Sequence, residues 1–245
     1  MLNFSLIDVL KNILILVPYI KSKAKLMHKT GIMDNTEKAL SRAAELTSVM
    51  KDNSVDEGRV VEFGPGKTGD TIIELSKNEK ISRAFVVDTE RYFPDDFWLN
   101  NGIDFLYKDS SMIRSDSIDL VYCYDVLEHV RRPMSFLREI KRIIKGNGVF
   151  FISWDLRDHL NINDEKKWFD MHKYNKTIWN LQMSNRSSYV NRLLFSEWIK
   201  IFENSGFTVS IVEILSSNIA QSGYYESTVC KIDPIYRAKV ILYSK

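Results

Sequence analysis

Short apolar runs alternate with helical stretches over residues 59–154 of the 245-residue chain. Residues 71–77 and 134–145 repeat their apolar positions with the 3.6-residue period of a helix that buries one side. Between these stretches lie runs that are short and apolar enough to be buried strands, namely RVVEF, AFVVD, DFLY, IDLVYC and GVFFISW. Strands that alternate with helices in this way predict a parallel sheet covered by helices, which is an α/β fold.

The chain beyond the fifth run resumes this pattern after an interruption. Residues 155–194 are polar and aromatic without a clear period, so we expect an insertion after strand five that forms a lid on the substrate side. Residues 195–204 then predict a helix, residues 207–215 a strand and residues 237–243 a last strand. The sheet therefore has two more candidate strands after the insertion.

We divide the chain into an N-terminal helical segment, residues 1–50, and one α/β domain, residues 51–245. Within the first part, Asp34-Asn35-Thr36-Glu37 has a capping side chain followed three residues later by an acid, which predicts the start of a helix. We expect that helix to run towards Met50, and a separate amphipathic helix to precede it.

Residues 2–20 predict that amphipathic helix rather than a membrane span. The apolar run is interrupted by Asp8, Lys11 and Asn12 and is too short to cross a bilayer. No basic segment precedes it, as a secretion signal would require. The apolar positions form one stripe and a basic tail follows: Leu2, Leu6, Val9, Ile13 and Leu16, then Lys21, Lys23 and Lys25. Such a helix either rests on a membrane surface through residues 1–25 or packs against the same protein or a second subunit, and we expect packing.

Composition and charge limit the possible partners. Apolar residues at 44% and charged residues at 27% are typical of a folded globular protein. A net charge of +2 is too small to indicate a nucleic-acid partner. Cys123 and Cys230 lie far apart without metal-ligand spacing, so we expect neither a disulfide framework nor a metal site. We expect the protein to be cytoplasmic, and contact with the inner face of the membrane stays open.

The glycine-rich turn Gly64-Pro65-Gly66-Lys67-Thr68-Gly69 is the first sign of chemistry. It follows the strand RVVEF and precedes a helix, where glycines permit a tight turn and a close approach of a ligand to the backbone. Asp88 ends the next strand, where a carboxylate can accept hydrogen bonds from both hydroxyls of a ribose. These features indicate a nucleoside cofactor, but both a nicotinamide dinucleotide and S-adenosylmethionine would fit them.

Two further acids favour S-adenosylmethionine. Glu62 lies two residues before the first glycine, where a carboxylate would attract an amino-acid ammonium group and repel a pyrophosphate. Asp109 and Ser110 follow the third strand, where they could meet the amino edge of an adenine. The fourth strand and the residues after it then read IDLVYCYDVLEHV.

With that segment, residues 59–154 resemble the class I S-adenosylmethionine-dependent methyltransferases. The resemblance implies a Rossmann-like, doubly wound sheet of seven mostly parallel strands with the last strand antiparallel, and S-adenosylhomocysteine as the product. It also implies that the turn holds the methionine part of the cofactor, Asp88 the ribose, and Asp109 with Ser110 the adenine. Tyr124 and Asp125 would lie near the sulfonium. The residues implied for the methionine part are Glu62, Gly64 and Gly66, and Phe63 and Pro65 beside them are also expected to bind the cofactor.

Proton transfer and acceptor binding have weaker candidates. His159 lies a few residues beyond the fifth strand and could act as a general base for an alcohol acceptor, although a loop histidine without function is as good an interpretation. His129, expected on a helix that begins with Val126, is assigned a structural role. Arg186, Tyr189, Asn191 and Arg192 in the insertion could bind a sugar or a phosphorylated group, or could belong to an aromatic core with exposed arginines.

The insertion is also similar to that of methyltransferases of bacterial capsule and surface-polysaccharide pathways, from Asp158-His159 through residues 187–193 and with His28 to Gly31 folding over the cofactor. This resemblance implies O-methylation of a sugar or of a phosphoryl group on a glycan precursor. A quinone-type acceptor is the main alternative, and an apolar tunnel would support it, whereas a polar cleft would support the sugar or phosphate. A nicotinamide-dependent reductase and a non-catalytic binding protein are the minor alternatives, and the oligomeric state is left open.

Overall fold

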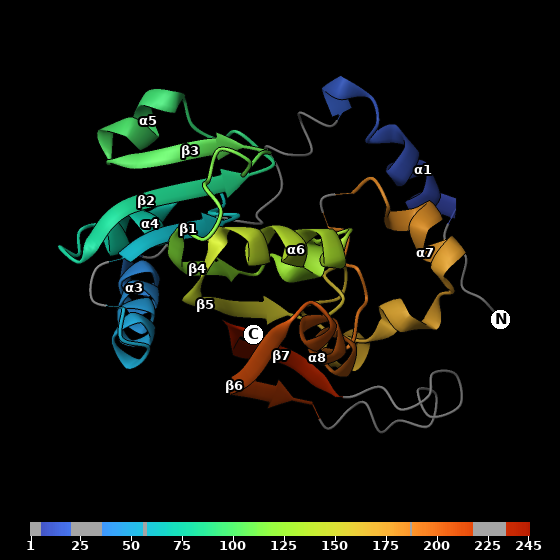
Figure 1. The fold of residues 1–245 in the computed structure, drawn as a ribbon. Helices are drawn as coiled ribbons and strands as arrows, with labels where there is room; N and C mark the ends of the chain where they lie inside the picture. The colour runs from blue at the N-terminus through green and yellow to red at the C-terminus, as the bar shows by residue number, and fades with distance from the viewer. Residues whose placement is uncertain (1–5, 21–35, 56–57, 187, 218–233) are drawn as a thin grey trace.

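The computed structural model describes residues 6–20, 36–55, 58–186, 188–217 and 234–245. Their strands are β1 (Gly58–Phe63), β2 (Ile81–Asp88), β3 (Ile103–Tyr107), β4 (Ile118–Tyr124), β5 (Ile144–Asp155), β6 (Phe207–Ser216) and β7 (Ile235–Ser244). They form one seven-stranded sheet in the order β3-β2-β1-β4-β5-β7-β6 (Figure 1). Strands β1 to β5 pair in parallel, whereas β7 runs antiparallel to both of its neighbours. The predicted mostly parallel sheet with an antiparallel last strand is confirmed.

Helices cover both faces of this sheet because successive strand residues point to opposite faces. One face packs against α6 (Pro133–Ile143) and α8 (Phe195–Asn204), and the other against α3 (Thr36–Asp52), α4 (Asp70–Ser76) and α5 (Asp95–Asn100). Strand β4 is buried along its whole length and lies at the centre of the sheet. Helix α3 contributes buried side chains to the second face, while the division of the chain at residue 50 stays a prediction.

Two elements differ from their predicted form. The helix expected to begin with Val126 is a single 3-10 turn, η1 (Leu127–His129), because Pro133 disfavours helical geometry at the residue before it and Arg132 is accordingly not helical. Strand β5 begins at Ile144 rather than at residue 148, because Ile144 pairs with Ile118 before the register shifts. The chain between β4 and α6 is therefore mostly irregular, and it lies at the carboxyl end of the sheet.

The insertion folds as a small unit beside the sheet. It contains η2 (Glu165–Lys167), η3 (Asp170–Lys173) and α7 (Lys176–Met183), and its core consists of Met171, Trp179, Met183 and Val190. Helix α1 (Leu6–Leu14) packs on α7 at the side of the molecule away from α5 (Figure 1). Among the described residues, it is the polar side of α1 and not its apolar stripe that packs on the same chain, while packing of the stripe on a second subunit stays a prediction.

Some sequence predictions fall outside the described residues. These are the basic tail of Lys21, Lys23 and Lys25, the stretch His28 to Gly31, the first two residues of the predicted helix cap, Ser187 and Cys230. Among the described helices, none combines the length and the apolar character that a bilayer span requires.

The turn between β1 and α4 offers a test of local packing. Gly69 has a φ of 63°, and a Cβ built there would lie 2.4 Å from the buried ring of Trp98. Gly69→Ala should therefore lower the free energy of unfolding by about 2–4 kcal/mol, from the left-handed backbone and from overpacking. Urea denaturation measures this change, provided that the wild type and the variant have the same m-value.

Gly102→Ala is the matched control. Gly102 has a φ of 71°, but no atom lies within 4 Å of the position that its Cβ would take. This variant should lose only about 1 kcal/mol, from the backbone alone. Equal losses in the two variants would contradict the proposed clash with Trp98.

Candidate functional site

A cavity of about 1060 Å³ opens at the carboxyl ends of the parallel strands. Residues from the ends of β1 and β2, from the chain after β3 and after β4, and from α6 line one side, and residues of the insertion line the other. The chain changes direction in the sheet between β1 and β4, and open α/β sheets bind ligands at such a point. The cavity is large enough for a nucleoside cofactor together with a small acceptor.

The glycine turn forms one wall of this cavity. Phe63 and Gly64 line it, whereas Pro65 and Gly66 do not. Gly64 has a φ of 69°, and a Cβ there would lie 2.6 Å from Cγ2 of Val126, which also lines the cavity. The turn thus lies directly against the chain that follows β4, and Val126 is a wall residue that the sequence did not single out.

Asp88 lies in the cavity wall at the end of β2. Its Oδ1 accepts a hydrogen bond of 2.9 Å from the backbone N–H of Glu90. Burial raises the pKa of Asp88 to about 6, although hydrogen bonds from the backbone of Glu90, Thr89 and Gly66 oppose that shift. The carboxylate is therefore held mainly by the backbone that follows β2, with a smaller contribution from Gly66 of the glycine turn.

Glu62 lies beneath the turn and not on the cavity surface. It is 4% exposed, and its Oε2 accepts a hydrogen bond of 3.2 Å from the hydroxyl of Tyr122. Burial raises the pKa of Glu62 to about 8, so the carboxyl is mostly protonated at neutral pH. The described geometry does not support the expected contact with an ammonium group.

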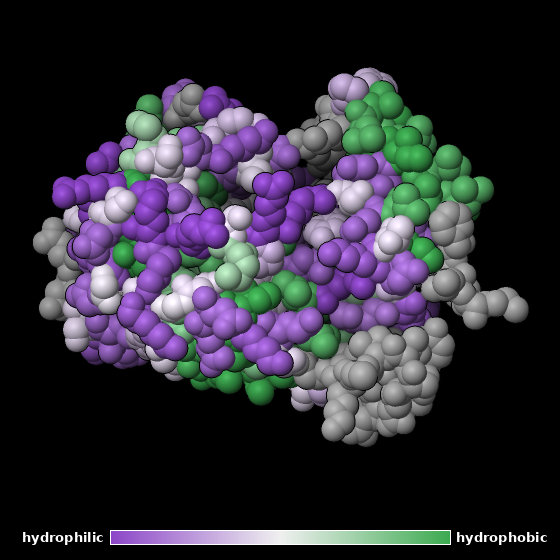
Figure 2. Space-filling model, turned by 45° about the vertical axis from the view of Figure 1, so that its right-hand side comes forward, coloured by the Kyte–Doolittle hydropathy of each residue, from purple (hydrophilic) through white to green (hydrophobic). Residues whose placement is uncertain are grey.

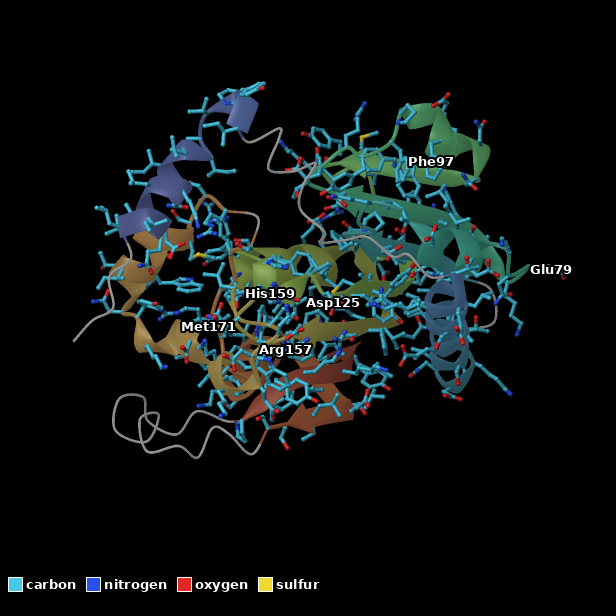
Figure 3. All side chains as sticks on the ribbon, turned by 180° about the vertical axis from the view of Figure 1, so that it is seen from behind. Glu79, Phe97, Asp125, Arg157, His159 and Met171 are labelled. Atoms are coloured by element: carbon cyan, nitrogen blue, oxygen red, sulfur yellow. The ribbon has the colours of Figure 1, made fainter. Side chains whose placement is uncertain are left out.

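Tyr124 and Asp125 also lie outside the residues that line the cavity. The hydroxyl of Tyr124 donates to Oε2 of Glu45 over 3.0 Å, and the guanidinium of Arg42 lies 4.0 Å from the centre of its ring. Asp125 has a φ of 55° and forms ion pairs with Arg42 at 3.3 Å and Arg237 at 2.8 Å. Figure 3 shows Asp125 near the centre of the molecule, where these pairs join α3 and β7 to the end of β4.

Asp109 and Ser110, which were both expected to meet the adenine, differ in their position relative to the cavity. Ser110 lines the cavity, and its hydroxyl donates to Oε1 of Glu139 over 2.7 Å. Asp109 is exposed and its carboxylate accepts hydrogen bonds from the backbone and hydroxyl of Ser111, which hold its pKa below the usual range. Only Ser110 of this pair is therefore positioned in the cavity wall.

His159 lies behind His129, which lines the cavity. The two rings meet edge to face with their centroids 5.0 Å apart, and Figure 3 shows His159 between the sheet and the insertion. Burial, and then the nearby His129, lower the pKa of His159 to about 4, which makes it a weak proton acceptor. Nδ1 of His129 lies 2.6 Å from the carbonyl oxygen of Tyr189 and so joins η1 to the insertion.

Glu128 completes a cluster with these two histidines. Possible ligand atoms of the three residues lie within 4.8 Å of one another, which is close enough to consider a metal ion. Burial raises the pKa of Glu128 well above its usual range, which favours the protonated carboxyl when no cation is near. The described contacts of this cluster join η1 to the insertion, through His129 and the carbonyl oxygen of Tyr189, and to β5, through Glu128 and the backbone N–H of Asp155.

Of the four residues predicted to bind the acceptor, two line the cavity and two do not. Arg186 and Tyr189 line the cavity. Asn191 instead donates to the backbone carbonyls of Leu127 and Val130, and Arg192 donates to those of Met171 and Tyr174. Asn191 therefore ties the insertion to the chain after β4, and Arg192 joins two segments within the insertion. On this side the cavity is also lined by Asn185 and by three residues that the sequence did not single out, Ile15, Arg131 and Arg132.

Comparison with known proteins adds three findings. A model of the methyltransferase domain family matches residues 35–212. A ubiquinone biosynthesis O-methyltransferase from Haemophilus ducreyi is 26% identical over 81 residues, which cover 33% of this chain and only 30% of that enzyme. Two solved structures share the fold: the YcgJ protein from Bacillus subtilis and a putative sarcosine dimethylglycine methyltransferase from Galdieria sulphuraria.

The two structural matches cover nearly the whole domain. For the Bacillus protein, the TM-score is 0.54 with 16% identity over 82% of this chain and 98% of that chain. For the Galdieria protein, the TM-score is also 0.54, with 10% identity over 84% of this chain and 86% of that chain. At these identities the matches show a common fold and carry no information about the acceptor.

The pKa of Asp88 predicts how cofactor binding depends on pH. The ionised carboxylate accepts a charge-assisted hydrogen bond on each oxygen, whereas the protonated carboxyl loses the charge and one strong acceptor. With a pKa of about 6, Asp88 is mostly ionised at pH 7 and mostly protonated at pH 5. The dissociation constant for S-adenosylmethionine should therefore rise roughly tenfold from pH 7 to pH 5. Calorimetry at each pH measures it.

The Asp88→Asn variant serves as the control for that titration. An amide does not ionise in this range, so the variant should bind weakly and with little dependence on pH. A wild-type affinity that stays constant between pH 5 and pH 7 would exclude Asp88 as the ribose acceptor.

Proposed function

Because the chain belongs to the methyltransferase domain family, we propose that it transfers a methyl group from S-adenosylmethionine to an oxygen of a phosphorylated sugar or a related phosphoryl acceptor. S-adenosylmethionine is the methyl donor of this family, and S-adenosylhomocysteine is the product. The observation that supports this choice of acceptor is the positive charge of the arginines that line the cavity beside η1 and α6.

The residues on the sheet side of the cavity match the parts of S-adenosylmethionine, the methyl donor. We propose that the ribose binds Asp88, that the methionine part lies along Phe63 and Gly64, and that the adenine lies beside Ser110. All four residues line one continuous cavity, and the turn that contains Gly64 also contributes to holding Asp88. This arrangement would direct the methyl group towards the chain after β4 and the insertion.

The acceptor side is basic. Arg131 and Arg132 line the cavity between η1 and α6, while Arg186 lines it from the insertion but already forms an ion pair with Asp8. The guanidinium of Arg131 lies 4.4 Å from the centre of the Tyr189 ring, which limits its position. Guanidinium groups bind phosphate oxygens with paired hydrogen bonds, so this basic side supports an anionic acceptor.

The chemistry fits a phosphoryl oxygen. The oxygen attacks the methyl carbon in line, the carbon–sulfur bond breaks, and the positive sulfonium becomes a neutral thioether. An ionised oxygen has no proton to lose, so this reaction needs alignment and exclusion of water but no general base. That requirement agrees with the position of His159 behind His129 and with its lowered pKa.

The capsule and surface-polysaccharide pathways remain part of this proposal, because their precursors carry phosphorylated sugars. A quinone-type acceptor is the second candidate, favoured by the partial match to the ubiquinone biosynthesis enzyme. Val126, Val130 and Phe136 give the cavity some apolar wall for an aromatic ring. A phenol would, however, need a group that removes its proton.

The proposed acceptor class is tested with a panel of sugar phosphates and dihydroxyphenols, scored by the mass gain of one methyl group. Sugar phosphates should be methylated, and Arg132→Gln should lower kcat/KM for them roughly tenfold or more, because a charged hydrogen bond is lost. The dissociation constant of S-adenosylmethionine should not change.

Arg138→Gln provides the matched control, since it removes the same charge from an exposed position of α6 outside the cavity lining. It should leave kcat/KM unchanged. If phenols are methylated and sugar phosphates are not, the acceptor is of the quinone type rather than a phosphoryl group. If Arg132→Gln and Arg138→Gln lower kcat/KM equally, Arg132 makes no specific contact with the acceptor.

A further inference from the structure

Helix α1 is held to the insertion by its polar side. Asn12 is 3% exposed, and its Nδ2 donates to the carbonyl oxygen of Leu181 over 2.9 Å. Its Oδ1 accepts from the backbone N–H of Asn185 over 2.7 Å. These partners lie at the C-terminal end of α7, where helix carbonyls lack partners within their own helix, so Asn12 caps α7.

A second polar contact lies one turn earlier on the same side of α1. Oδ1 of Asp8 forms an ion pair of 3.0 Å with Arg186, and both side chains are largely covered. Residues four apart share one side of a helix, so Asp8 and Asn12 together fix the rotation of α1 about its axis. The opposite side of the helix must then face away from the protein.

That opposite side is apolar and exposed. We define the apolar face of α1 and its extension as Leu6, Ile7, Leu10, Ile13, Leu14 and Val17, which are between 46% and 65% exposed. Figure 2 shows a continuous green band over this part of the molecule. A surface helix in water normally buries its apolar side, so this face indicates a partner that is not part of the described chain.

The charge around the apolar face favours an anionic partner. Asp8 is the only acid in α1 and is paired with Arg186, whereas Lys11 is exposed at the edge of the face. The sequence continues with Lys21, Lys23 and Lys25, whose positions lie outside the described residues. An exposed apolar helix face with basic residues near it is typical of helices that lie on anionic lipid.

The size of the face argues against a second copy of the chain as the partner. The nine residues of α1 span roughly 14 Å, and a helix is about 10 Å wide. A stable protein interface usually buries about 800 Å² on each partner, far more than one side of such a helix offers. A lipid surface needs no complementary partner surface, and a short helix can lie within its headgroup region.

We propose that the apolar face of α1 inserts into the headgroup region of an anionic lipid surface, with the helix parallel to that surface. Ile15, directly after α1, lines the cavity together with Asn185 and Arg186, so the cavity lies next to the protein-facing side of the helix that carries the docking face. An acceptor anchored in the lipid would therefore reach the cavity past this helix, a consequence that rests on the proposed function, whereas the docking itself does not.

Docking is tested with the full chain alone, without cofactor or acceptor. The chain should sediment with vesicles of phosphatidylglycerol and phosphatidylcholine and should bind vesicles of phosphatidylcholine alone more weakly. The double variant Leu10→Gln and Ile13→Gln should reduce the partition into anionic vesicles roughly tenfold or more, because two large apolar side chains leave the lipid. Its thermal unfolding midpoint should not change, because both side chains are exposed.

The control double variant is Leu99→Gln and Met112→Gln, which removes two apolar side chains that are 68% and 80% exposed elsewhere on the surface. It should bind vesicles like the wild type. The proposal is overturned if the wild type stays in the supernatant with anionic vesicles, or if both double variants partition equally. Loss of a wild-type dimer in the α1 variant, measured by light scattering without vesicle binding, would identify a second copy as the partner instead.

Discussion

The contact between the turn after β1 and the chain after β4 sets the geometry of the cavity. Gly64 lies so close to Val126 that a single Cβ would overlap it, and β1 and β4 are neighbours at the point where the chain changes direction in the sheet. Through Gly66, the same turn contributes a hydrogen bond to the Asp88 carboxylate at the end of β2. One turn thus positions the wall and the entrance to η1 and helps to hold the acid.

Burial and charge then divide the cavity into two ends. Asp88 gives the sheet end an acid that a ribose can use, while Arg131 and Arg132 make the opposite end basic. Glu62 adds little negative charge at neutral pH, because burial keeps it mostly protonated beneath the turn. A positively charged donor and an anionic acceptor would therefore each meet a suitable end, and the chain between β4 and α6 would lie where they react.

The sequence was sufficient to predict the sheet, the glycine turn and the positions of Asp88 and Ser110 at the cavity, because these depend on strand alternation and on the ends of strands. Alternation could also have placed Glu62, which shares a strand face with Val60 and so points towards α3 and α4. By contrast, the roles of Asn191 and Arg192 depend on backbone carbonyls that need partners, and the orientation of α1 depends on Asn12 capping a helix about 170 residues away. No local pattern contains such distant partners.

The central claim, that the cavity holds S-adenosylmethionine, is tested most directly by calorimetric titration of the full chain with S-adenosylmethionine and with NAD in parallel. The account predicts one bound S-adenosylmethionine for each chain and no heat from NAD. Tight binding of NAD without any response to S-adenosylmethionine would contradict it.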